Sequence, residues 1–222
     1  MMARKFLLPK PLIYVFCEGE SEQAYTAYLK EIFRDVAVIK IPSELGLFST
    51  AKAKFAKDAK FRDIVSEVDE IWFFFDVEKS DQPNWDNHLK IIRHLRNLRK
   101  KPGVRVRLLM TTACIEYWLL LHYKRIAPPL STISDKESML RQVRNEVPEY
   151  QKGNRASTWK IAEHYKTAVE NAQSILHRLQ QDGLPTLEDT DERNRWLFCS
   201  SFTFTTVQEA IQFLETEREK RT

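Results

Sequence analysis

Two uninterrupted runs of apolar and aromatic residues stand out in the first third of the chain. The first covers residues 12–17 and leads into the acidic segment 18–22, and the second covers residues 71–75 and leads into Asp76-Val77-Glu78. Continuous apolar runs are typical of strands that are buried on both faces of a parallel sheet. Each run therefore predicts a central strand that ends abruptly in carboxylates and turn residues.

The pattern around these runs alternates between strand and helix. Strands are predicted over residues 12–17, 36–41, 69–75 and 104–110, and helices over residues 21–33, 51–68, 85–101 and 113–123. This alternation indicates an α/β fold, with right-handed crossovers, a parallel sheet and helices on both faces. The strand over 104–110 alternates in its first residues, which is typical of a strand at or near a sheet edge.

The remainder of the chain predicts a helical annex. Pro128-Pro129 marks a boundary, so we expect an α/β core over residues 1–125 and a C-terminal helical extension over residues 126–222 that packs on it. Helices are predicted over 135–147, 157–180 and 207–218, with a loop over 182–193 before the last of them.

The acidic residues that follow the two runs are candidate metal ligands. Ligands of open parallel sheets bind beyond the carboxyl ends of the strands. If the two strands are neighbours, Glu18, Glu22, Asp76 and Glu78 converge there, which is unfavourable unless a cation offsets their repulsion. Mg²⁺ or Mn²⁺, held by a few carboxylates, water and phosphate oxygens, is the expected ion. The alternative is that these acids only begin helices and end strands.

Composition narrows the class of protein. Hydrophobic residues make up 43% and charged residues 30% of the 222, and no apolar run reaches the roughly 20 residues that a membrane span needs. The basic, briefly apolar start is too short for a signal peptide, so a cytoplasmic location is expected. The three cysteines are far apart in the sequence, which disfavours a disulfide framework and a structural zinc site. The net charge of +4 leaves nucleic acid open as a partner.

These motifs resemble the Toprim module of topoisomerases, bacterial primases and overcoming-lysogeny-defect nucleases, in which they bind Mg²⁺. The closer resemblance is to the RloB family. Its Cys-Glu-Gly-x-x-Glu turn matches residues 17–22, and its Trp-x-x-x-Asp-x-acid strand end matches residues 72–78. Its Phe-Glu-x-Trp-Leu-Leu-Leu-His-Phe helix reappears as residues 115–123. The resemblance extends through residues 150–152, 168–172 and 203–207. Two departures are Glu78, where Asp is usual, and residues 111–114, which replace Ser-Asn-Pro-Cys.

The resemblance implies a Toprim-like, Mg²⁺-dependent nuclease that acts on DNA or RNA in defence against phage or foreign nucleic acid. Family members are encoded beside restriction-modification or abortive-infection genes, often with an AAA-type ATPase partner. Glu18, Asp76 and Glu78 would hold the metal, and Glu22 and Glu116 would support a second ion or orient the attacking water. The alternatives are a non-catalytic or partner-activated interaction subunit and a primase-like nucleotidyl transferase.

Two further groups of residues have open roles. Glu116 lies in an apolar helix, where it is either a metal ligand or a carboxylate paired with Arg105, Arg107 or Lys124. The basic segments 52–60 and 93–101 are usually solvated helix faces. If they flank the acidic site they could hold a phosphate backbone, with Lys152, Lys160 and Arg96 as the candidate nucleic-acid contacts. No P-loop sequence and no histidine-based zinc motif occurs.

Overall fold

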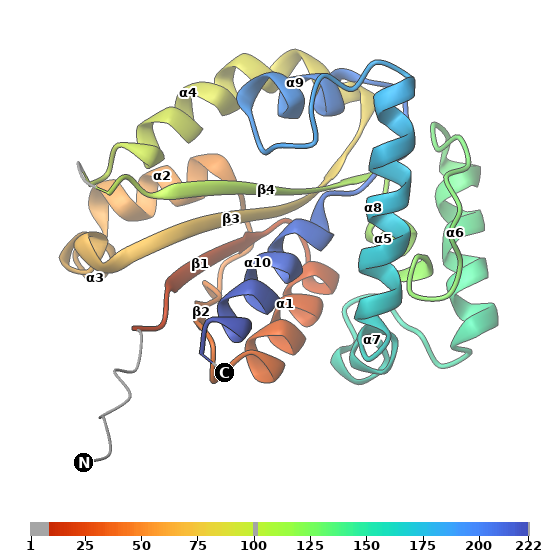
Figure 1. The fold of residues 1–222 in the computed structure, drawn as a ribbon, viewed down its shortest axis with the longest axis horizontal. Helices are drawn as coiled ribbons and strands as arrows, with labels where there is room; N and C mark the ends of the chain where they lie inside the picture. The colour runs from red at the N-terminus through yellow and green to blue at the C-terminus, as the bar shows by residue number, and fades with distance from the viewer. Residues whose placement is uncertain (1–8, 100–101, 222) are drawn as a thin grey trace.

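The computed structural model describes residues 9–99 and 102–221, and its centre is a single parallel sheet (Figure 1). The strands are β1 (Leu12–Cys17), β2 (Val38–Lys40), β3 (Val68–Val77) and β4 (Arg105–Thr112), in the order β2-β1-β3-β4. The prediction of an α/β fold with a parallel sheet is therefore confirmed. The two strands that end in carboxylates are direct neighbours, because Cys17 of β1 pairs with Phe74 of β3.

Helices cover both faces of this sheet. The α-helices are α1 (Glu20–Ile32), α2 (Phe48–Lys57), α3 (Ala59–Asp63), α4 (Trp85–Arg96), α5 (Ile115–Leu120), α6 (Ile133–Glu146), α7 (Arg155–Ala162), α8 (Tyr165–Gln181), α9 (Asp191–Cys199) and α10 (Val207–Glu219), and the 3₁₀ helices are η1 (Val65–Glu67) and η2 (Lys79–Asn84). In Figure 1, α4 and α9 lie above the sheet and α1 and α10 below it, while α6 and α8 stand beyond the carboxyl ends of the strands.

The two layers explain why β3 is apolar at every position from Ile71 to Phe75. Trp72 and Phe74 pack with residues of α1, α5 and α10, whereas Phe73 and Phe75 pack with residues of α2, α4 and α9. A strand directs alternate side chains to opposite faces, so both faces need apolar residues when both are covered. Both core clusters also contain residues from beyond position 125, and the C-terminal helices therefore help to form the core of the sheet.

Several helix predictions were wrong in detail. The helix predicted over 51–68 is divided into α2, α3 and η1, because Asp58 is extended and its side chain accepts a hydrogen bond from the N–H of Lys60 at the start of α3. The helix predicted over 157–180 is two helices, since α7 packs mainly on α1 and α8 on α10. The segment after residue 182 contains α9, which begins where the Thr190 side chain accepts from the N–H of Arg193.

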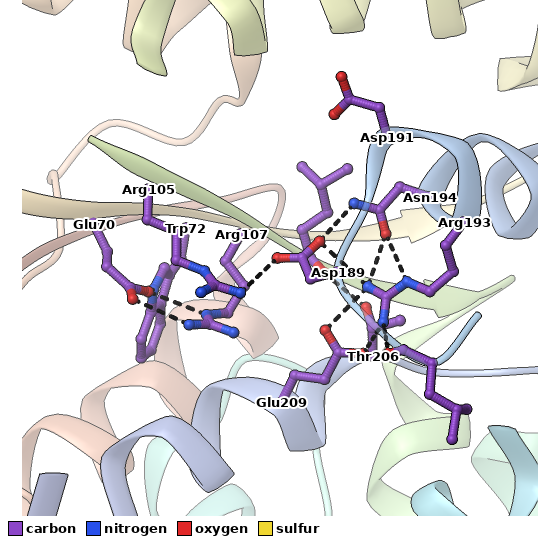
Figure 2. A network of polar contacts seen from close by, with 12 residues as sticks. Glu70, Trp72, Arg105, Arg107, Asp189, Asp191, Arg193, Asn194, Thr206 and Glu209 are labelled. Carbon is purple, nitrogen blue, oxygen red and sulfur yellow. Dashed lines mark hydrogen bonds and ion pairs between the residues drawn. The ribbon is translucent and has the colours of Figure 1, made fainter. Parts of the chain in front are cut away.

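A buried polar network joins the C-terminal segment to β4 (Figure 2). Arg193 forms ion pairs with Glu209 (Nη1–Oε1 2.5 Å) and Asp189 (Nη2–Oδ1 3.3 Å), and Asp189 also pairs with Arg105 of β4 (3.4 Å). Beside it, Arg107 donates two hydrogen bonds of 3.1 Å to the Glu70 carboxylate. These contacts fix the segment along β4.

The same segment covers the outer edge of the sheet. Thr111 and Thr205 form an isolated antiparallel bridge, and the Thr206 hydroxyl donates to the carbonyl of Leu108 (2.7 Å). This explains why β4, although last in the sheet order, is buried on both faces from Val106 onward. Within the described residues no helix is both long enough and apolar enough to cross a membrane. The first eight residues, on which the signal-peptide expectation depends, lie outside the described residues, as do Lys100 and Lys101 at the end of the helix predicted over 85–101.

Candidate functional site

Asp76 is the centre of the acidic site. It lies near the carboxyl end of β3, in register with Thr111 of β4 and on the same face as Trp72 and Phe74. Strand alternation therefore directs it toward the layer that contains α1 and α5. Those two helices carry Glu22 and Glu116, and both side chains are buried.

Glu18 lies directly beside Asp76. The backbone N–H of Glu18 donates to the carbonyl of Phe74 (3.0 Å), which extends the pairing of β1 with β3 by one step. The Glu18 carboxylate then accepts a hydrogen bond from the backbone N–H of Asp76 (2.8 Å). The two residues, 58 positions apart in the sequence, thus share one rim of the sheet, and no arginine lies between them in these contacts.

The Glu22 side chain lies close to the backbone of Gly19, at the start of α1. A Cβ atom placed on Gly19 would lie 2.9 Å from the Glu22 carboxylate, which is closer than unbonded atoms normally approach. Gly19 therefore leaves room for this carboxylate, in the first turn of the helix where the backbone N–H groups favour negative charge. The close approach of the Glu22 carboxylate therefore explains why glycine follows Glu18 in this turn.

Glu116 is fully buried and has two polar neighbours. The Tyr150 hydroxyl donates to its Oε1 (3.1 Å), and the Lys152 ammonium lies 3.2 Å from its Oε2. The turn that carries both residues is attached to α1, because the N–H of Gly153 donates to the Ser21 hydroxyl (2.9 Å). The expected alternative pairing with Arg105, Arg107 or Lys124 was wrong: Arg107 binds Glu70, Arg105 binds Asp189 and Lys124 binds Glu146.

Glu78 is exposed, beyond the end of β3. Its carboxylate binds the Lys136 ammonium of α6, and its backbone N–H donates to the Asp81 carboxylate (3.1 Å) at the start of η2. Lys136 was absent from the sequence-based set. A solvent-facing lysine in an amphipathic helix gives no local signal that it will meet a carboxylate 58 residues away.

The electrostatics of the site reflect the crowding of carboxylates. Burial raises the pKa of Asp76 well above its usual range, and the charges of Glu22, Glu18 and Glu116 raise it further. Burial followed by repulsion from Glu18 and Glu116 raises the pKa of Glu22 to about 7. The pKa of Glu18 is also raised, first by desolvation and then by Asp81 and Glu78. The site therefore resists carrying its full negative charge without a cation.

The connection between β4 and α5 is strained at this rim. Ala113 has φ of 67°, a left-handed conformation that non-glycine residues adopt rarely. Its N–H donates to the carbonyl of Val77 (3.0 Å), and the N–H of Cys114 donates back to Thr112 (2.8 Å). Strain of this kind is often found at functional sites. Here it aligns the start of α5, and with it Glu116, against the end of β3.

The three basic residues predicted to contact nucleic acid do not all lie at the carboxylate site. Lys152 is at the site, and its side chain remains 58% exposed. Lys160 of α7 is near the same turn, where it binds Glu149. Arg96 binds Asp191 and lines a hollow with Gly103 and Arg105, at the amino end of β4 and therefore at the opposite rim of the sheet.

The donor set fits a hard cation, although the ligands are not gathered into a closed cage. The Oδ1 atom of Asp76 is buried and has no hydrogen-bond partner among the residues that the structure describes, and every nearby acidic group is an oxygen donor of the type that Mg²⁺ prefers. Across residues 9–99 and 102–221, no three acidic, histidine or cysteine side chains lie close enough together to hold an ion by themselves. Mg²⁺ commonly uses one or two carboxylates and completes its shell with water and substrate phosphate.

Comparison with known protein families identifies a related family. A family model described as RloB-like protein matches residues 13–214, which include β2, β3, β4, all of β1 except its first residue, and the carboxylates described above. Neither a curated protein nor a solved structure gives a match.

Proposed function

We propose, from the premise that the chain belongs to the RloB-like protein family, that it is a Toprim-type, Mg²⁺- or Mn²⁺-dependent nuclease acting in defence against foreign nucleic acid. The observation that carries the proposal is the convergence of Glu18, Glu22, Asp76 and Glu116 at the carboxyl ends of two neighbouring strands. Raised carboxylate pKa values and an unpartnered Asp76 oxygen support a cation at this point.

Asp76 and Glu18, with Glu78 beside them, would hold the ion. When bound, it would polarise the scissile phosphate and lower the pKa of a coordinated water. The chain's own residues would position the reacting groups: the Tyr150 hydroxyl fixes the orientation of Glu116, and Glu116 and Glu22 can accept hydrogen bonds from the attacking water. Lys152 and Lys136, now bound to carboxylates, would neutralise phosphate oxygens of the substrate backbone.

The test is cleavage by the purified chain of labelled DNA and RNA, with Mg²⁺ or Mn²⁺, beside Asp76→Asn and Glu18→Gln. Both variants should lose at least about 100-fold in rate, since removal of one electrostatic stabiliser commonly costs that much. Mn²⁺ binding, followed by electron paramagnetic resonance, should weaken in the same variants. Glu137→Gln, on the exposed face of α6, is the matched control. Cleavage at the wild-type rate in both site variants would contradict the proposal.

A second candidate is a subunit that becomes active only with a partner, such as an AAA-type ATPase. The observation that favours it is that Glu18, Glu78 and Glu116 are each engaged within the chain, by the Asp76 N–H, Lys136 and Lys152. If the chain alone cleaves neither DNA nor RNA, and the ATPase encoded beside it restores cleavage that Asp76→Asn abolishes, the partner-activated form is correct. Restored cleavage that survives Asp76→Asn would assign the activity to the partner.

A further inference from the structure

The connection between α9 and α10 lies directly beside the carboxylate site. Gln82 of η2 donates to the carbonyl of Ser200 (3.3 Å), and the Thr112 hydroxyl at the end of β4 donates to the carbonyl of Phe202 (3.2 Å). Thr112 follows Thr111, which is in register with Asp76. A segment that follows its contact residues by 90 to 118 positions is thus held against the rim that carries the proposed metal ligands.

A cavity of about 480 Å³ lies between this connection, η2 and the start of α6. Its lining includes Glu78, Lys79, Lys136 and the small hydroxyl residues Ser131 and Ser201. Ammonium and hydroxyl groups are the usual partners of phosphate and sugar in nucleic-acid complexes. Because the cavity begins at Glu78, a nucleotide joined to a phosphate at the carboxylates would extend into it.

An aromatic pair lies at the far end of the same path. Ser200 and Ser201 also line a second hollow, which continues to Trp196 and Phe202. The Trp196 and Phe202 rings stack with an interplanar angle of 12° and a centroid separation of 5.3 Å. Phe202 nevertheless remains 37% exposed, which is unusual for a large apolar residue among those the structure describes. Its backbone is held by Thr112, so the exposed ring is a fixed platform.

We infer that the proposed nuclease binds an unpaired strand, with one nucleotide in the cavity beside Glu78 and Lys136 and a neighbouring base stacked on Phe202. The inference rests on the proposed function, whose substrate it narrows from nucleic acid in general to single-stranded nucleic acid. An exposed aromatic ring stacks on a base whatever its identity, whereas the faces of a base within a duplex are already covered by its neighbours. The alternative is that a segment of a partner protein, rather than a base, packs on the exposed Phe202 ring.

The test is binding of fluorescent 12-nucleotide single strands, in DNA and RNA form, compared with hairpin duplexes of the same sequence. Fluorescence anisotropy is measured with Ca²⁺ in place of Mg²⁺, so that binding is separated from cleavage. Single strands should bind at least tenfold more tightly than duplexes. Phe202→Leu should weaken single-strand binding about tenfold, the size expected for the loss of one base–aromatic stack, and Phe202→Tyr should retain it.

Val38→Ala is the matched control, because Val38 is 38% exposed and lies at the start of β2, at the opposite rim. A thermal midpoint for Phe202→Leu within about 2 °C of wild type shows that the fold is intact. Equal binding of duplexes and single strands, wild-type affinity in Phe202→Leu, or no binding of any oligonucleotide would overturn the inference.

The two proposals fail separately. If the wild-type chain cleaves nothing with Mg²⁺ or Mn²⁺, yet prefers single strands through Phe202, a nuclease that is active without a partner is refuted and the strand site stands. If cleavage depends on Asp76 but proceeds equally on duplexes and in Phe202→Leu, the nuclease stands and the strand site is refuted.

Discussion

Replacing Glu22 with glutamine should stabilise the metal-free protein, by an amount that grows with pH. Glu22 is only 4% exposed, and burial, Glu18 and Glu116 together raise its pKa from the usual 4.5 to about 7. The folded protein therefore holds a proton on Glu22 at pH values where the unfolded chain has released it. Glutamine keeps the shape and the hydrogen-bonding oxygen of the side chain but has no charge to bury.

The sign and size follow from this difference in pKa. Between pH 4.5 and about 7 the folded state binds more protons than the unfolded state, so the free energy of unfolding falls as pH rises. Each pH unit between the two pKa values costs about 1.4 kcal/mol. The ionised Glu22 therefore destabilises the wild type by on the order of 3 kcal/mol above pH 7, and has no such effect below pH 4.5.

Urea unfolding in EDTA at pH 4.5, 6, 7 and 8 measures the effect. The stabilities of wild type and Glu22→Gln should agree at pH 4.5 and separate by about 3 kcal/mol at pH 8, or roughly 6–12 °C in the thermal midpoint. Glu137→Gln, an exposed glutamate of α6, should follow the wild type at every pH. Mg²⁺ should narrow the gap at pH 8. A difference that does not change with pH, or a glutamine variant that is less stable at pH 8, would refute the reasoning.

Two further predictions concern stability. Arg193→Ala should cost about 3–5 kcal/mol, because it removes the ion-pair partner of the buried Glu209 carboxylate and one of the two arginines that pair with Asp189. The neighbouring exposed Arg195→Ala should cost less than about 0.5 kcal/mol. Urea unfolding compares the two variants, and equal costs would contradict the role of the network. Gly153→Ala should cost about 1–2 kcal/mol more than Gly183→Ala. Both glycines have positive φ, but only at Gly153 would the new methyl carbon lie 3.0 Å from the Cβ of Glu20, which is fixed by the α1 backbone, as well as 2.7 Å from the Glu20 carboxylate oxygen. Equal thermal midpoints would show that these contacts are harmless.

The local sequence was sufficient to predict the strands and the meeting of Glu18 and Asp76 at the centre of the site. The apolar runs before Glu18 and Asp76 predict buried strands because a sheet covered on both faces needs apolar residues at every position. Parallel strands place their carboxyl ends at one rim, which is why two acids 58 residues apart could be expected to meet. The missed helix α9 also has a local signal, namely Thr190 as its N-cap followed by two acidic residues, but its short apolar stretch does not show a clear helical period.

Only the tertiary structure decided what surrounds these carboxylates. The partners of Glu116, the contact of Lys136 with Glu78 and the position of Phe202 beside Thr112 all join segments separated by 34 to 90 residues. Their residue types are ordinary for exposed helices and turns, so no periodicity or spacing marks them. The backbone pairing of β1 with β3 continues step by step from Ile13 to Cys17, and the apolar pattern of the sequence marks both strands. A single ion pair between distant surfaces depends on how whole helices pack, and that is determined by the sum of many side-chain contacts rather than by any local segment.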